Sequence, residues 1–120
     1  MSTGRMRRVD EAIRQVLGDA VAAELKDPRV GFVTVTDVRT SADLRHARVY
    51  VSVLGDGGRA STVQQREATM AGLRSAHGFL QAKVASELRL KRTPTLELHY
   101  DDTTDRAMRV DELIEELGQE

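Results

Sequence analysis

The sequence predicts an α/β fold, more fully an α+β domain of two layers, in which helices cover one face of a three-stranded sheet. Two observations predict it. Residues 45–54 alternate between apolar and polar side chains, which is the pattern of a strand with one buried face. Residues 7–26 and 61–90 instead repeat apolar side chains at helical spacing. Strands and helices mixed within 120 residues favour one compact unit.

Composition narrows the classes of function. We expect a single domain over residues 1–120, with a core of about 6–102 and an acidic C-terminal helix of about 104–118. The chain has no cysteine, which excludes disulfides, thiol catalysis and thiolate metal sites. Aromatic residues make up 3%, so a surface that stacks many bases is not expected. With no long apolar run and no signal-peptide pattern, we expect a cytoplasmic protein without membrane contact.

The charge is distributed unevenly although the formal net charge is only −1. Residues 1–14 carry four arginines against two carboxylates, and residues 74–92 carry five lysines and arginines against one glutamate. Residues 97–120 carry two arginines against nine carboxylates. Salt screens charges beyond about 8–10 Å, so the basic segments can still bind a polyanion locally.

The first half of the chain predicts a helix followed by a hairpin. The helix over residues 7–26 ends before Pro28, because a residue that precedes proline is disfavoured in the α region. Residues 32–39 are rich in β-branched side chains and predict a strand. The short turn between this strand and residues 45–54 predicts an antiparallel pair. The glycines that follow, in residues 55–58, lack the spacing of a phosphate-binding loop.

Two helices then meet at a kink. We expect helices over residues 61–75 and 79–90, the first buried through Val63, Met70, Ala71 and Leu73 and the second through Leu80, Val84 and Leu88. The junction is Ala76-His77-Gly78, where glycine permits the close approach of another backbone. A helix N-terminus exposed there would offer free N–H groups to phosphate. The alternative interpretation is a helical hairpin whose basic side chains are simply solvated. It explains the same spacing of apolar and basic residues.

The last third of the chain predicts a strand and a terminal helix. Residues 95–101 alternate, and a right-handed crossover through the helical pair places this strand parallel to residues 45–54. All the helices can then cover one face of the sheet. Asp101, Asp102 and Asp105 could hold Mg²⁺, but an aspartate or threonine at a helix start is the favoured interpretation.

Little in the sequence points to catalysis. The three histidines, His46, His77 and His99, lie in different predicted elements without ligand spacing, and no serine has the context of a nucleophile. We therefore expect no enzyme, no metal and no cofactor.

The order of these elements resembles the type II KH arrangement of RNA-binding modules, except that Ala76-His77-Gly78 replaces the usual G-x-x-G loop. Several motifs make the resemblance more specific. They are V-T-V-T-D-V at residues 33–38, S-A-D-L-R-H-A-R-V-Y-V-S-V at residues 41–53, A-H-G-F-L at residues 76–80 and L-K-R-T-P-T-L at residues 90–96. With these motifs the chain resembles the ribosome-binding factor A family, bacterial small-subunit assembly factors with a KH-like domain.

The resemblance implies a non-catalytic monomer that binds the free or immature 30S small ribosomal subunit. It implies a role in late maturation and 16S rRNA processing, near the 5′-terminal helix of that RNA and particularly in the cold. Assembly GTPases or ribosomal proteins are possible further partners. Two alternatives remain open: a generic single-stranded RNA-binding KH module, and a protein-interaction module whose acidic last helix docks a basic partner.

We expect the RNA contacts to come from cations and from the kink, through phosphate binding and shape. The candidates are Arg5, Arg7, Arg8, Arg14, Arg45, Arg48, Arg74, His77, Gly78, Lys83, Arg89, Lys91 and Arg92, with Ala76 completing the kink. For each cation, the alternative is an ordinary solvated charge.

Overall fold

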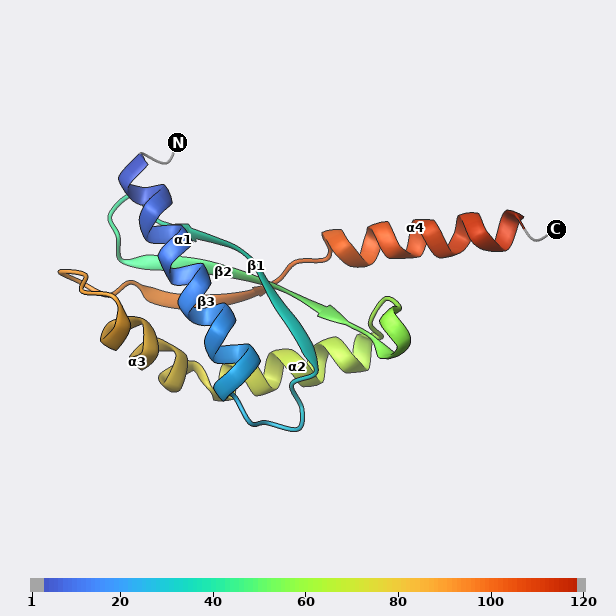
Figure 1. Cartoon of the computed structure of the whole chain (residues 1–120), viewed down its shortest axis with the longest axis horizontal. Helices are drawn as coiled ribbons and strands as arrows, with labels where there is room; N and C mark the ends of the chain where they lie inside the picture. The colour runs from blue at the N-terminus through green and yellow to red at the C-terminus, as the bar shows by residue number, and fades with distance from the viewer. Residues whose placement is uncertain (1–3, 119–120) are drawn as a thin grey trace.

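The computed structural model describes residues 4–118, without the side chains of residues 104, 105 and 108. The elements follow one another as expected (Figure 1). They are α1 (Gly4–Asp19) with a π-helical turn (Ala20–Glu24), β1 (Phe32–Thr40), β2 (His46–Leu54), a 3-10 turn (Asp56–Gly58), α2 (Val63–Ser75), α3 (His77–Glu87), β3 (Thr95–Tyr100) and α4 (Thr103–Gly118).

Strand β2 is the centre of a three-stranded sheet with the order β1-β2-β3. It pairs antiparallel with β1 and parallel with β3, and both expectations are thereby confirmed. The register places Val49 opposite Val38 on one side and opposite Leu98 on the other. A bulge between Val35 and Asp37 interrupts the first pairing.

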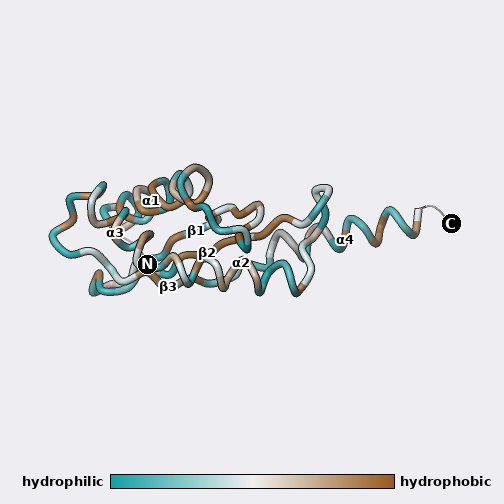
Figure 2. The backbone as a smooth tube through the Cα atoms, turned by 90° about the horizontal axis from the view of Figure 1, so that it is seen from below, coloured by the Kyte–Doolittle hydropathy of each residue, from teal (hydrophilic) through white to brown (hydrophobic). Residues whose placement is uncertain are grey.

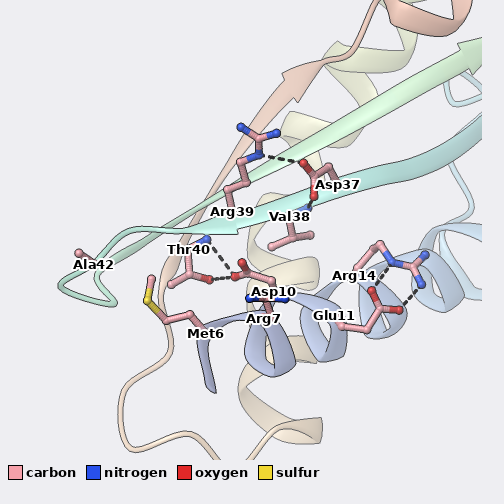
Figure 3. Close-up of a pocket in the computed structure, with 10 residues that line it drawn as sticks. All are labelled: Met6, Arg7, Asp10, Glu11, Arg14, Asp37, Val38, Arg39, Thr40 and Ala42. Carbon is pink, nitrogen blue, oxygen red and sulfur yellow. Dashed lines mark hydrogen bonds and ion pairs between the residues drawn. The ribbon is translucent and has the colours of Figure 1, made fainter. Parts of the chain in front are cut away.

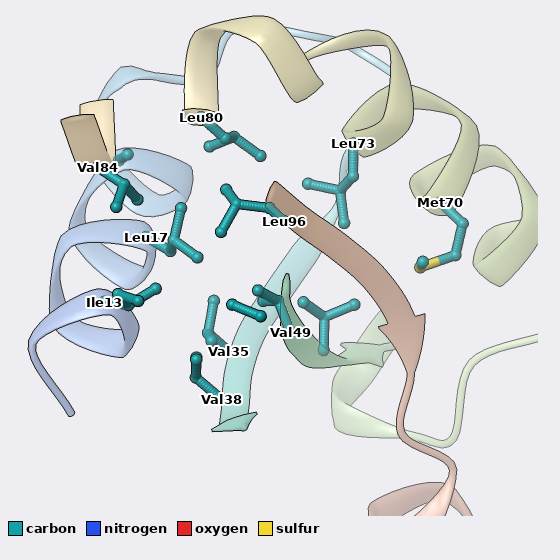
Figure 4. Packing of buried hydrophobic residues seen from close by; sticks show 13 residues of the cluster. Ile13, Leu17, Val35, Val38, Val49, Met70, Leu73, Leu80, Val84 and Leu96 are labelled. Atoms are coloured by element: carbon teal, nitrogen blue, oxygen red, sulfur yellow. The ribbon is translucent and has the colours of Figure 1, made fainter. Parts of the chain in front are cut away.

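The core lies between one face of the sheet and helices α1, α2 and α3. Along β2, Ala47, Val49, Val51 and Val53 are buried, as the alternation predicted. Figure 4 shows side chains from both layers pointing into this shared interior. The buried cluster comprises Ile13, Leu17, Ala20, Val35, Val38, Ala47, Val49, Val51, Met70, Leu73, Leu80, Val84 and Leu96.

Helices α1, α2 and α3 cover the sheet as expected, whereas α4, whose packing the sequence left open, does not join this layer. It runs away from the layered body (Figures 1 and 2). Its apolar side chains Val110, Leu113, Ile114 and Leu117 are 55–61% exposed. Two residues, Asp101 and Asp102, link it to β3.

Asp101 anchors the start of α4. Its backbone N–H donates to the Val51 oxygen over 2.7 Å, and its carboxylate accepts the Thr103 N–H at 3.0 Å and the Thr36 hydroxyl at 2.8 Å. The bonds that the carboxylate accepts lower the pKa of Asp101, and the bond from the Thr103 N–H has the largest effect. The interpretation of this segment as a helix start is therefore confirmed. The Asp105 side chain lies outside the described residues.

Several helix positions differ from expectation. Helix α1 begins at Gly4 rather than residue 7, and α3 ends at Glu87 rather than residue 90, because Leu88 is already extended. In α2 the buried residues are Thr69, Met70, Gly72 and Leu73, so Val63, at the start of the helix, and Ala71, on its outer side, are exposed, contrary to the predicted stripe.

The close backbone approach predicted at Gly78 is not observed, and it is Gly72 that lies close to side chains of another segment. A Cβ atom at Gly78 would meet nothing within 4 Å, whereas one at Gly72 would lie 2.7 Å from Val30 Cγ2. The turn after Pro28 lies on α2 at this point, and the Thr69 hydroxyl donates to the Arg29 oxygen at 3.3 Å. Gly72 thus lets the turn after α1 pack on α2.

Replacing these two glycines by alanine should have opposite effects on stability. We expect Gly72→Ala to lower the free energy of unfolding by about 1–3 kcal/mol, since the new methyl group must displace Val30. Gly78→Ala should not destabilise the fold, because alanine is favoured over glycine in a helix by up to about 1 kcal/mol. Urea unfolding of both variants checks this, and equal losses of stability would contradict the packing described.

Candidate nucleic-acid interface

Cations from separate segments meet at one end of the domain. One hollow of about 480 Å³ is lined by Arg5, Val9, Asp43, Leu44, Leu90, Lys91, Arg92 and Pro94. A second, of about 530 Å³, is lined by Arg5, Arg8, Val9, Ala12, Glu87, Leu88, Arg89 and Leu90. Because they share Arg5, Val9 and Leu90, they form one continuous depression, here called the basic groove. Its floor is apolar and its rim is cationic.

The sheet explains why these segments meet. Thr95 pairs with His46 in the parallel register, and the Thr95 N–H donates to the Arg45 oxygen over 2.8 Å. The loop from residue 88 to 94 therefore ends beside the β1–β2 turn. Val9 of α1 and Leu88 of the loop are partly buried against the common core, which brings the first turns of α1 to the same place.

The cations around the basic groove are available to an outside anion. Arg5, Arg8, Arg45, Arg89, Lys91 and Arg92 are all exposed. Within residues 4–118, none of them has a carboxylate within ion-pair distance. Of the two carboxylates that line the groove, Asp43 accepts the Ser41 hydroxyl at 2.6 Å and the Arg45 N–H at 3.1 Å. Both bonds lower the pKa of Asp43, and the bond from the Ser41 hydroxyl has the larger effect.

Two predicted contacts are engaged within the protein instead. Lys83 Nζ lies 2.8 Å from Glu24 and 3.6 Å from Glu87, joining the end of the first helix to α3. The Glu24 carboxylate is the main cause of the raised pKa of Lys83. Arg14 forms a two-pronged pair with Glu11, with Nε donating over 2.9 Å, and the pKa of Glu11 is lowered by it. Both cations are already neutralised locally.

Arg7 and Arg14 line a separate hollow, of about 830 Å³, on the flank of α1 that faces the end of β1 (Figure 3). Asp10, Glu11 and Asp37 line it too, so its charge is mixed. The sequence indicated both arginines as candidate RNA contacts but did not show that these carboxylates lie beside them. Because this hollow carries charges of both signs, it attracts a polyanion less strongly than the basic groove does.

The kink is pinned to β3 rather than open. Ala76 is the only residue between α2 and α3, and the His77 Nε2 atom lies 2.8 Å from the Leu96 oxygen. Gln81, which was not among the residues predicted from the sequence, donates to the Pro94 oxygen at 2.8 Å and accepts the Leu96 N–H at 3.0 Å. The kink residues, with Arg74, do not line the basic groove.

Arg48 also lies apart from the groove. It is exposed and lines a shallow hollow with Arg39, His46 and Glu97. The cations of the groove were predicted from the sequence, but its apolar floor of Val9, Leu44, Leu90 and Pro94 was not. Among the described residues, no group of three or more histidine, aspartate or glutamate side chains could hold a metal ion.

The sequence matches the model of one protein family, ribosome-binding factor A, over residues 5–114. The chain belongs to this family. The ribosome-binding factor A family is named for binding and not for a chemical reaction, in keeping with a groove lined by cations and aliphatic side chains. No helix within residues 4–118 combines the length and the apolar character that crossing a membrane requires.

Solved ribosome-binding factor A structures have the same fold. A solution structure of a Thermotoga maritima protein assigned to the family is 33% identical, covering 82% of this chain and 89% of its own, with a TM-score of 0.68. The crystal structure of the Thermus thermophilus factor is 27% identical, covering 79% and 94%, with a TM-score of 0.65. A Thermus thermophilus homology model fitted into a cryo-EM map of a 30S complex is 28% identical, covering 78% and 92%, with a TM-score of 0.59.

Asp10 should fix the arginine-bearing end of α1 on the sheet. Its carboxylate accepts both the N–H of Thr40, at 2.9 Å, and the Thr40 hydroxyl, and Thr40 is only 7% exposed. We expect Asp10→Ala to lower the free energy of unfolding by about 1.5–3 kcal/mol, since it strands two buried donors. The neighbouring exposed Glu11, changed to alanine, is the matched control and should cost much less. Equal losses in urea unfolding would contradict this.

Proposed function

We propose that this protein binds the small (30S) ribosomal subunit, in its free or immature form, and assists its late maturation without catalysing a reaction. Its membership of the ribosome-binding factor A family supports this, as does the relative that was fitted into a map of a 30S complex. The single observation that carries the proposal is the basic groove, which is lined by five exposed cations that have no carboxylate partner within the described chain.

The proposed mechanism is phosphate binding on a folded RNA surface. Arg5 and Arg8 from α1, Arg45 from the β1–β2 turn and the cations of the following loop would each neutralise phosphates. Every such contact releases counterions, so affinity falls steeply as salt rises. The groove has no aromatic side chain to stack bases in series. Recognition would therefore depend on the shape and charge of the RNA.

The finer role that we propose is assistance to 16S rRNA processing near the 5′-terminal helix. A bound factor that holds one RNA arrangement contributes most when competing RNA helices are most stable, which is at low temperature. We therefore propose a cytoplasmic monomer whose contribution is greatest in the cold. Its acidic α4 would face a basic protein on the particle rather than RNA, because phosphates would repel it.

Charge reversal of two comparable lysines, one in the basic groove and one outside it, tests whether the groove binds RNA. Lys91 and Lys26 are both exposed loop lysines without an ion pair in the described chain, but only Lys91 lines the groove. In co-sedimentation with isolated small subunits across a salt series, we expect Lys91→Glu to weaken binding severalfold. The slope of log affinity against log salt should fall by about one unit. Lys26→Glu should leave both quantities unchanged.

Three other outcomes would change the account. Equal effects of the two reversals would exclude the groove as the contact surface. Failure of the unmodified protein to bind subunits, with tight binding to a short single-stranded oligonucleotide, would favour a generic RNA-binding module. Loss of subunit binding on removal of α4, with no effect of Lys91→Glu, would favour protein docking through that helix.

A further inference from the structure

The β1–β2 turn places an aliphatic side chain at the edge of the basic groove against local backbone preference. Leu44 has φ +60°, and it is the only non-glycine residue in the described chain with positive φ. L-amino acids other than glycine are disfavoured in this left-handed region. Glycine or asparagine would be the ordinary choice here. A leucine held in such a conformation is a candidate for function rather than for folding.

Hydrogen bonds on both sides hold this turn in place. The Leu44 N–H donates to the Ser41 oxygen over 2.9 Å. The Ser41 hydroxyl donates to Asp43 and accepts the His46 N–H at 3.1 Å, while Asp43 also accepts the Arg45 N–H. Leu44 is 38% exposed and lines the same hollow as Val9, Leu90 and Pro94. The turn therefore presents a fixed aliphatic surface to the groove.

The chemistry of this hollow fits a nucleotide whose base has left the stack. Its floor of Val9, Leu44, Leu90 and Pro94 can contact the flat face of a base, and Arg5, Lys91 and Arg92 on the rim can bind the phosphates on either side. Its volume of about 480 Å³ lies in the usual range of roughly 300–1,000 Å³ for small-ligand pockets. We infer that this end of the basic groove holds one unstacked nucleobase of a bound RNA.

The inference rests on the proposed function and names the RNA element that the groove would recognise. Bases within a duplex are stacked and paired, so only a loop, bulge or single-stranded junction can supply one. The one carboxylate in the hollow, Asp43, is already engaged by Ser41 and Arg45. The hollow would therefore detect the presence of a base rather than its identity. The cationic rim favours RNA over an apolar protein segment, whose backbone is uncharged.

Leu44→Gly separates this contact from folding. Glycine adopts φ +60° freely, so the variant should unfold at the same or a higher urea concentration while losing the aliphatic surface. Leu54→Ala is the control, because Leu54 is 39% exposed at the far end of β2.

The probes are two fluorescein-labelled single-stranded RNA hexamers that differ only in one central nucleotide, adenosine or an abasic ribose. The full-length protein should bind the first roughly five- to tenfold more tightly, the lower part of the range for single-base contacts because the pocket is aliphatic. Leu44→Gly should bind both hexamers with the affinity of the abasic one, and Leu54→Ala should keep the preference.

Equal binding of both hexamers by the unmodified protein would overturn the inference, as would a preference that Leu44→Gly retains. If Leu44→Gly changed neither hexamer affinity but weakened binding to whole small subunits, the hollow would hold a protein side chain instead, and the inference would again be wrong. Failure of the proposed function is distinguishable, because the unmodified protein would then not sediment with small subunits at all.

Discussion

The parallel pairing of β3 with β2 is the constraint on which the rest of the molecule depends. The bond from the Thr95 N–H to the Arg45 oxygen, 2.8 Å long, joins the end of one loop to the turn of the hairpin. Since the crossover through α2 and α3 must return to this point, the loop from residue 88 to 94 has a fixed endpoint. Helix α1, packed on the same core, adds Arg5 and Arg8. The basic groove is therefore a consequence of strand register.

The same residue types serve two purposes in this fold. Lys83 and Arg14 are paired with carboxylates and join or brace helices, whereas Arg5, Arg89 and Lys91 have no such partner within the described residues. An anion that approaches Lys83 or Arg14 must compete with a glutamate. An anion that approaches the basic groove meets cationic N–H donors that have no carboxylate partner within the described residues. Local charge pairing thus identifies a candidate surface that a net charge of −1 conceals.

The sequence predicted the sheet and the order of elements because both follow from periodicity and connection rules. The alternation along β2 predicted its buried face, and the handedness of crossovers predicted a parallel β3.

The sequence could not show that Gly72, not Gly78, meets another segment, because the approach of Val30 depends on tertiary packing. For the same reason it named Lys83 as a contact without its partner Glu24, and it missed Leu44, whose backbone conformation has no periodic signal. The sequence also left open whether the acidic last helix packs on the sheet, and the structure leaves the apolar side chains of α4 exposed.

The claim that the basic groove faces ribosomal RNA is tested most directly by site-specific photo-crosslinking. A photoreactive amino acid at exposed Glu87, which lines the basic groove, would sample that groove, and one at exposed Glu97 would sample the open face of the sheet. With purified small subunits, we predict a crosslink to 16S rRNA from position 87 and none from position 97. RNA crosslinks from position 97 alone would contradict the account and would move the interface to the open face of the sheet.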